Sequence, residues 1–400
     1  MKRVIAFMLL FVFVLSFGTT AFAKKATKTE AEQYSISPAS IDVDCRSALL
    51  MEAETGEIIY SKNENDPLAP ASVTKIMTLL LVMEAIDEER ISLEDNVTVS
   101  ANAASMGGSQ VFLEEGEKMS VRDLLKCAVI ASANDAAVAL SEYVSGSEGA
   151  FVDAMNKRAE ELGMKNTTFE NTTGLDDTTE NHKTSALDIA IMSRALISHP
   201  LILEYSSLWQ DTIRNGEFTL TNTNRLVRYY DGCNGLKTGS TDKAGYCISA
   251  TAKREGMQLI AVVMGADTRD ERNNIARTML DFGFSNYALY RCEEEALEKA
   301  DVWGGSYDSA TLYTSGFVKL IDKKYKSKVE KYYDLPEHIE APVKEGERLG
   351  SVKYVIDGKL LSEEPVYVKC EIEKIGSFDL FLYMLRMAVM GKITDKEEKI

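Results

Sequence analysis

The sequence is poor in residues that bind transition metals. It has 3 histidines in 400 residues, and its 6 cysteines are scattered without a C-x-x-C pair. Zinc sites need clustered cysteine or histidine ligands, so a zinc site is disfavoured and no cofactor is expected. Disulfides form in oxidising compartments, but an even count establishes no pairing. The cysteines are Cys45, Cys127, Cys233, Cys247, Cys292 and Cys370.

Positive charge is also scarce. The chain carries 45 Lys and Arg against 62 Asp and Glu, which gives a formal net charge of −17. Nucleic-acid binding depends on basic side chains that neutralise phosphates, so this composition excludes nucleic acid as a partner. The acidic surface is better explained by solubility.

The N-terminal apolar stretch, Val4 to Phe17, is too short to span a bilayer. Lys2 and Arg3 precede it, and Ala21-Phe22-Ala23 follows it. Together these segments are typical of a secretory signal peptide at residues 1–23, cleaved before Lys24. We therefore expect export, with a retained anchor as the alternative. Cleavage removes Lys2 and Arg3 and takes the net charge to −19.

Residues 24–36 are polar and predict a short tether, after which the pattern becomes globular. Turn residues around Gly56 and around Gly256 separate short β-rich runs, which predicts two hairpins. Helical patterns fill the interval between them and follow the second hairpin, at 73–87, 121–143, 149–162, 184–197 and 273–284. Strands at both ends with helices between them predict an α+β domain over residues 37–290, built on one sheet whose strands come from distant sequence.

The remaining sequence divides into two parts. Over residues 291–375 short β-rich pieces alternate with charged turns, which predicts a small all-β domain. It has no cluster of catalytic residue types, so a spacer or interaction module is the simplest interpretation.

Residues 376–400 predict a C-terminal helix and tail. The apolar run from Phe378 to Met390 would be about 20 Å long as a helix, short of the ~30 Å of a bilayer core. Phe378, Phe381, Leu382, Leu385 and Val389 share one helical face. We expect this amphipathic helix to associate with the membrane surface. Packing on the β domain and a dimer contact remain the alternatives.

Ser72-Val73-Thr74-Lys75 opens a long apolar run and gives the first candidate for chemistry. Residues i and i+3 share a helical face, so the Lys75 amine can reach the Ser72 hydroxyl. A serine is a poor nucleophile unless a neighbour takes its proton. Lysine can do so when burial lowers its pKa. The S-x-x-K spacing is common in helices, so by itself it does not establish a catalytic site.

Two further motifs follow this serine and lysine. Ser132-Ala133-Asn134 interrupts a helical region and can direct a hydroxyl and an amide into one cleft, although it also fits an ordinary helix cap. Lys237-Thr238-Gly239 precedes the second hairpin and fits an edge strand, where Gly239 would allow another backbone close approach. A lysine and a hydroxyl there suit a carboxylate ligand. A solvated edge-strand lysine is the alternative.

The three motifs S-x-x-K, S-x-N and K-T-G in this order resemble the signature of β-lactamases and penicillin-binding proteins. The wider sequence resembles the low-molecular-mass penicillin-binding proteins that act as D-alanyl-D-alanine carboxypeptidases, strongly over residues 37–290. The matching stretches are 70–78, 132–137, 151–156, 162–167, 235–239 and 263–267. The resemblance implies a β-lactamase/transpeptidase-like fold, an antiparallel sheet with a helical subdomain, followed by the small all-β domain and the terminal helix.

The resemblance also implies a mechanism. Ser72 would attack the penultimate D-alanine carbonyl of a peptidoglycan stem peptide, and Lys75 would accept its proton. Ser132 and Asn134 would complete the proton network and hold the substrate amide. The backbone N–H groups of Ser72 and Ser240 would form the oxyanion hole. β-Lactams would be covalent inhibitors, and the outer face of the cytoplasmic membrane or the cell wall would be the site of action.

The terminal carboxylate of the substrate would be bound by Lys237, Thr238 and Arg272. Arg272 fits a distal family arginine, although a surface ion pair with Asp270 or Glu271 is the alternative. His182 matches a family histidine and is expected to position a loop.

The sequence departs from the family at two positions, and three other functions remain open. Ala133 replaces a frequent glycine, and Ser240 stands where some members have histidine, which puts the deacylation rate and β-lactam sensitivity in doubt. A D,D-endopeptidase of the same family usually ends near residue 290. A class A β-lactamase would need an E-x-x-L-N segment, which the interval between Ser132 and Lys237 lacks. A catalytically inactive binding or scaffold protein would not need the complete set of motifs.

Overall fold

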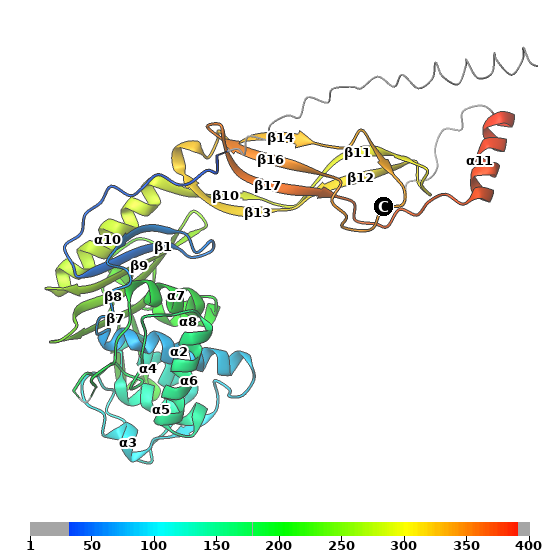
Figure 1. Cartoon of the computed structure of the whole chain (residues 1–400). Coiled ribbons are helices and arrows are strands. Elements are labelled where there is room, and N and C mark those ends of the chain that lie inside the picture. Colours follow the sequence, from blue (N-terminus) through cyan, green and yellow to red (C-terminus); the bar gives the residue numbers. More distant parts are fainter. Residues whose placement is uncertain (1–31, 178, 391–400) are drawn as a thin grey trace, which may run out of the picture.

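The computed structural model describes residues 32–177 and 179–390, so the predicted signal peptide, the first part of the tether and the last ten residues lie outside the described residues. The molecule is elongated (Figure 1). An α+β region lies at one end, a β-rich region extends from it, and helix α11 lies at the far end (Figure 1). This confirms the predicted fold class.

The α+β region is built on a five-stranded antiparallel sheet of order β2-β1-β9-β8-β7. Strand β1 pairs with β9, so the first and last parts of this region meet in one sheet, as predicted. Gly56 has a positive φ of 74° in the β1–β2 turn. The strands are β1 (Ser47–Glu52), β2 (Ile58–Lys62), β7 (Cys233–Thr241), β8 (Gly245–Arg254) and β9 (Met257–Ala266).

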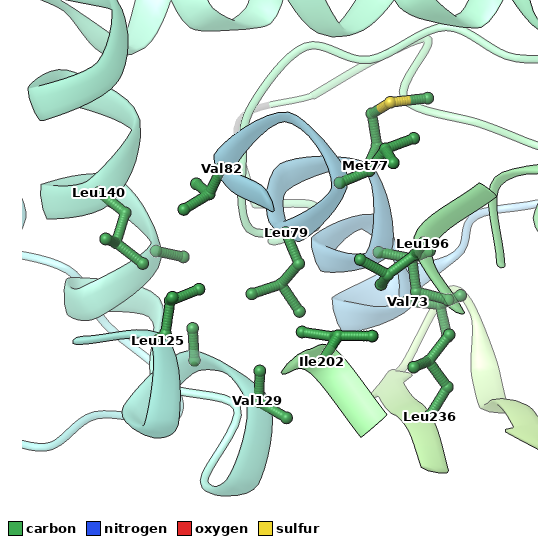
Figure 2. Close-up of a cluster of buried hydrophobic side chains, with 14 of the residues drawn as sticks. Val73, Met77, Leu79, Val82, Leu125, Val129, Leu140, Leu196, Ile202 and Leu236 are labelled. Atoms are coloured by element: carbon green, nitrogen blue, oxygen red, sulfur yellow. The ribbon is translucent and has the colours of Figure 1, made fainter. Parts of the chain in front are cut away.

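One face of the sheet carries the helical subdomain. Helix α2 is apolar on nearly all sides and lies at its centre, in contact with α4, α5 and α7. Figure 2 shows Leu79 of α2 directed toward Val129 of α4 and Ile202 of α8. The helices are η1 (Ala71–Thr74), α2 (Lys75–Asp87), α4 (Val121–Ile130), α5 (Asn134–Ser145), α6 (Glu148–Glu161), α7 (Ala186–Ile197) and α8 (Pro200–Ser206). On the opposite face α10 (Arg269–Asn286) packs on β8 and β9.

Serine caps explain where several helices begin. The hydroxyls of Ser120, Ser147 and Ser185 accept hydrogen bonds from the backbone N–H three residues on, at the starts of α4, α6 and α7.

Short elements that the sequence pattern did not reveal connect these helices and strands. They are β3 (Asn96–Thr98), α3 (Ala101–Ala104), β4 (Lys118–Ser120), β5 (Gln210–Ile213), η2 (Arg214–Gly216), β6 (Phe218–Thr221) and α9 (Leu226–Tyr229).

The β-rich region has its own buried core. Strands β10 (Tyr287–Cys292) and β13 (Phe317–Asp322) pair next to α10, and η3 (Lys323–Tyr325) follows β13. A six-stranded sheet of order β14-β16-β17-β12-β11-β15 continues away from them. Its strands are β11 (Glu295–Trp303), β12 (Ser309–Thr314), β14 (Glu330–Asp334), β15 (His338–Glu340), β16 (Gly350–Ile356) and β17 (Lys359–Tyr367). The Tyr34 hydroxyl donates to the Asp322 carboxylate over 2.5 Å, which ties the start of the described chain to this region.

Helix α11 (Ser377–Met390) exposes those of its apolar side chains that the structure describes. Phe378 is 71% exposed and Phe381 is 59% exposed. Within the described residues, no single helix is long and apolar enough to cross a membrane. Helices α7 and α8 meet that criterion only as a pair bent by 105°, and both contribute to the buried core.

A cavity in the core of the helical subdomain and a cavity in the core of the β-rich region should each destabilise mainly its own region. Leu312 is 1% exposed and belongs to the core of the β-rich region. Leu125 of α4 is fully buried and belongs to the core of the helical subdomain. Each Leu→Ala change should cost about 2–5 kcal/mol of unfolding free energy. Hydrogen exchange should accelerate in the β strands of residues 291–375 for Leu312→Ala, and in the helical subdomain for Leu125→Ala. Equal acceleration throughout the chain in either variant would contradict separate cores.

Candidate active site

The three motifs meet where the start of α2, the turn between α4 and α5, and strand β7 come together. Gly239 makes the approach of β7 possible. A Cβ atom at this position would lie 2.7 Å from the backbone nitrogen of Ser72 and 2.9 Å from the carbonyl oxygen of Pro70. Strand β7 is an edge strand of the sheet, as predicted for Lys237-Thr238-Gly239.

Lys75 is completely buried and contacts three oxygen atoms. Its Nζ lies 3.1 Å from the Ser72 hydroxyl, 2.5 Å from Asn134 Oδ1 and 3.0 Å from the carbonyl oxygen of Thr173. The Asn134 amide nitrogen donates to the Gly107 carbonyl over 2.7 Å, which fixes its oxygen toward Lys75. The structure therefore brings Ser72, Lys75 and Asn134 into one hydrogen-bonded group.

Burial lowers the pKa of Lys75 well below its usual range, and the positive charge of Lys237 lowers it further. The carboxylate of Asp135 opposes this effect. Lys237 is also almost completely buried, and burial together with the charge of Arg272 lowers its pKa to about 7. Lys237 is therefore partly neutral near pH 7, and the lowered pKa of Lys75 favours its neutral amine, so both lysines can exchange protons with bound groups.

Ser132 connects the second motif to the third. Lys237 Nζ donates to the Ser132 hydroxyl over 2.7 Å and to the Thr238 carbonyl over 2.9 Å. Ser132 has a φ of 63°, a strained conformation that costs about 1–3 kcal/mol for a non-glycine residue. Ala133 occupies the N-cap position of α5 and makes no side-chain cap bond. The helix-cap interpretation of Ser132 and Asn134 is therefore wrong.

The remaining predicted residues lie along β7 and behind it. The Thr238 hydroxyl donates to Thr223 over 2.8 Å, and Ser240 is exposed at the end of the motif. Arg272 is 3% exposed and donates to the carbonyl of Cys247 and to the Asn273 side chain. The alternative of a surface ion pair for Arg272 is thus wrong. It affects Lys237 through its charge.

A loop at residues 171–174 supplies a part of the site that the sequence pattern did not reveal. Glu148 accepts bonds from the backbone N–H and the hydroxyl of Thr172, over 3.2 and 2.8 Å. The Thr172 carbonyl accepts from the Thr78 hydroxyl over 2.6 Å, and the Asn171 side chain accepts from the Thr173 N–H over 3.2 Å. These bonds fix the Thr173 carbonyl that faces Lys75. The sequence N-T-T-G at residues 171–174 is typical of a turn, but its spacing does not predict that the Thr173 carbonyl contacts Lys75.

His182 positions this loop, in agreement with its expected role. Its Nδ1 accepts from the Glu170 N–H over 3.1 Å, so its Nε2 carries the proton and donates to the Thr74 hydroxyl over 2.8 Å. That hydroxyl donates in turn to the Ala71 carbonyl over 2.9 Å. Burial lowers the pKa of His182 to about 4, so its ring is neutral at physiological pH.

Comparison with known families agrees with this geometry. A family profile described as D-alanyl-D-alanine carboxypeptidase matches residues 29–268, more than half of the chain. The chain belongs to this family. A second profile, for the C-terminal domain of penicillin-binding protein 5, matches residues 284–374.

Individual members of the carboxypeptidase family are similar over most of the chain. D-alanyl-D-alanine carboxypeptidase DacF of Bacillus subtilis is 44% identical over 94% of this chain and 96% of its own length. The crystal structure of penicillin-binding protein 5 from Haemophilus influenzae superposes with a TM-score of 0.73 at 31% identity, covering 85% of this chain and all of that one. Penicillin-binding protein D2 of Listeria monocytogenes, solved in an ampicillin-bound form, superposes with a TM-score of 0.57 at 33% identity, covering 62% of this chain and 99% of that one.

The His182 contacts predict how acid affects stability. The pKa of His182 is about 4 in the folded chain and near 6.5 when unfolded, so the unfolded chain binds the extra proton between these values. Unfolding free energy should therefore fall as pH drops from 7 to 4, with His182 contributing up to about 3 kcal/mol of the loss. His182→Gln, which does not titrate, should show a smaller fall in chemical denaturation series. Identical pH dependence in the two proteins would contradict this account.

Proposed function

We propose that this carboxypeptidase-family protein removes the terminal D-alanine from peptidoglycan stem pentapeptides through an acyl-enzyme on Ser72. The observation that carries the proposal is the position of the buried Lys75 amine, 3.1 Å from the Ser72 hydroxyl. The name of the Bacillus subtilis relative supports the reaction, and the ampicillin-bound relative supports covalent reaction with β-lactams.

Hydrogen-bond counting supports the proposal that Lys75 is the base. A neutral amine has two hydrogens and one lone pair, and two of the three oxygens around Lys75 belong to carbonyl groups that can only accept. Asn134 and Thr173 therefore take the two hydrogens. The lone pair is left for the Ser72 hydroxyl, the one partner that can donate.

The proposed reaction then proceeds in two stages. Lys75 takes the Ser72 proton as Oγ bonds to the carbonyl carbon of the penultimate D-alanine. The tetrahedral intermediate collapses with cleavage of the C–N bond, and the proton passes through Ser132 to the leaving nitrogen of D-alanine. Water next attacks the ester carbonyl carbon and gives a proton to Lys75. The bond between this carbon and Ser72 Oγ then breaks, Lys75 returns the proton to Oγ, and the shortened peptide leaves.

Strand β7 is proposed to bind the substrate. Lys237 and Thr238, with the charge of Arg272 behind them, would hold the terminal carboxylate, and Gly239 allows β7 to lie against the backbone at Ser72, which brings these side chains to the nucleophile. The N–H groups of Ser72 and Ser240 would stabilise the oxyanion, each contributing about 3–4 kcal/mol. An edge strand also offers free backbone groups to an extended peptide.

The proposed setting is the outer face of the cytoplasmic membrane, where peptidoglycan is made. It follows from the signal peptide at residues 1–23, the tether at 24–36 and the exposed apolar helix within 376–400. The catalytic domain is proposed to span 37–290 and the β domain 291–375.

The contacts of Glu170 disfavour a β-lactamase. Its carboxylate accepts bonds from the backbone N–H groups of Glu180 and Asn181, over 2.9 and 3.2 Å. These bonds occupy the carboxylate within its own loop, whereas the deacylating glutamate of a class A β-lactamase acts on water.

Two substrates separate the candidate functions. The purified protein should be labelled covalently by a fluorescent penicillin and should release D-alanine from diacetyl-lysyl-D-alanyl-D-alanine. Ser72→Ala should abolish both, at least a 10³-fold loss of turnover. Labelling without release would favour a binding protein, and rapid turnover of penicillin would favour a β-lactamase. Faster cleavage of crosslinked dimers than of the pentapeptide would favour an endopeptidase.

The low pKa of Lys237 predicts the alkaline limb of the pH profile. Lys237 must be protonated to hold a carboxylate, and its pKa in the free enzyme is about 7. The kcat/KM for the peptide should therefore fall as pH rises above this value. Arginine keeps its charge, so Lys237→Arg should move the alkaline limb up by at least about one pH unit, although its maximal rate falls. If the alkaline limb of the kcat/KM profile has the same position in Lys237→Arg, a group other than Lys237 is responsible for it.

A further inference from the structure

The loop between β11 and β12 exposes two aromatic side chains. Trp303, the last residue of β11, is 59% exposed, and Tyr307 is 43% exposed. Gly304 and Gly305 lie directly after Trp303. Both Trp and Tyr combine an apolar ring with a polar edge, which suits them to a boundary between water and an apolar phase.

Trp303 is held in place despite its exposure. Its ring stacks on His338 of β15 with the centroids 3.6 Å apart and an interplanar angle of 15°. Backbone pairing in the β11–β15 ladder fixes both residues. A ring that is already ordered loses little conformational entropy when it binds a partner.

The same loop is bonded to the segment that leads into α11. The Ile375 N–H donates to the Gly304 carbonyl over 2.8 Å, and the Ser306 N–H donates to the Glu373 carbonyl over 2.9 Å. Helix α11 begins two residues after Ile375. Figure 1 shows α11 beyond the end of the β domain that carries β11 and β12.

The described side chains of α11 favour lipid over a protein partner. Phe378, Leu380, Phe381, Leu382, Met384 and Leu385 are all at least 39% exposed. At 100° per residue they cover more than half of the helix circumference, more than the single stripe that one packed helix would cover.

We propose that Trp303 and Tyr307 contact the interfacial layer of a lipid bilayer beside α11. The β domain would then touch the membrane directly at this loop. The inference rests on the membrane association of α11 proposed above. Trp and Tyr are the residues enriched at the boundary between headgroups and acyl chains.

The charges around the loop indicate that the rings provide the contact. Asp301, Asp308 and Glu340 are exposed near Trp303 and Tyr307. Lys374, which forms a β-bridge with Gly305, is also exposed, but these carboxylates outnumber it, so the net local charge would repel anionic headgroups. The contribution of the loop to binding should therefore not increase with the anionic lipid fraction.

The chain has 2 tryptophans, which allows a direct spectroscopic test. Trp209→Phe in protein of residues 24–400 leaves Trp303 as the one tryptophan. On adding phosphatidylethanolamine–phosphatidylglycerol vesicles, its emission should shift to shorter wavelength, and lipids brominated on the acyl chain should quench it. Trp303→Ala with Tyr307→Ala should weaken vesicle binding about tenfold, equivalent to about 1.4 kcal/mol.

Tyr332→Ala is the matched control, because Tyr332 is 55% exposed but lies on β14 at the opposite edge of the sheet. It should leave vesicle affinity unchanged. Vesicle binding with no change in Trp303 emission would overturn the inference and leave the α11 proposal standing. No vesicle binding would overturn both. An emission shift that depends on protein concentration without lipid would assign the loop to self-association instead.

Discussion

Complete burial of the Lys75 amine against three oxygen atoms is the constraint on which the rest of the structure depends. A charged lysine in this position would cost several kcal/mol of desolvation, so the neutral form is favoured. Its three partners come from η1, α5 and the loop at 171–174, which are far apart in sequence. The helical subdomain, the His182 contacts and the Glu148 contacts all hold these partners in place.

The second constraint is the close approach of β7 to η1. Gly239 permits it, and Lys237 then reaches Ser132 across the cleft. The positive charge of Lys237 lowers the pKa of Lys75, and the positive charge of Arg272 in turn lowers the pKa of Lys237, so burial and neighbouring positive charge both favour neutral amines here. The catalytic group therefore depends on the sheet as much as on the helices. The β domain lies between this region and α11 (Figure 1), as a spacer between the active site and the proposed membrane contact of α11 would.

The sequence predicted that the three motifs lie together, because each motif is tied to a short spacing, and the catalytic roles of their residues stay predictions. Ser72 and Lys75 are one helical turn apart, and Gly239 accompanies Lys237 on its strand. The hairpins and main helices also followed from periodicity and turn residues. The Thr173 carbonyl could not be predicted, since any residue type offers that group and only tertiary packing turns it toward Lys75. The burial of Arg272 could not be predicted either, because its neighbours Asp270 and Glu271 are typical of an exposed helix.

The central claim is that Lys75 is neutral when it meets Ser72. Lysine ε-carbon and amine signals, followed by NMR through a pH titration of ¹³C,¹⁵N-lysine-labelled protein, test it most directly. Lys75→Arg and Lys237→Arg assign the two buried signals. The account predicts that the Lys75 signal shows the neutral amine well below the pH at which the exposed lysines titrate. A Lys75 signal that remains that of the ammonium ion until the exposed lysines titrate would contradict it.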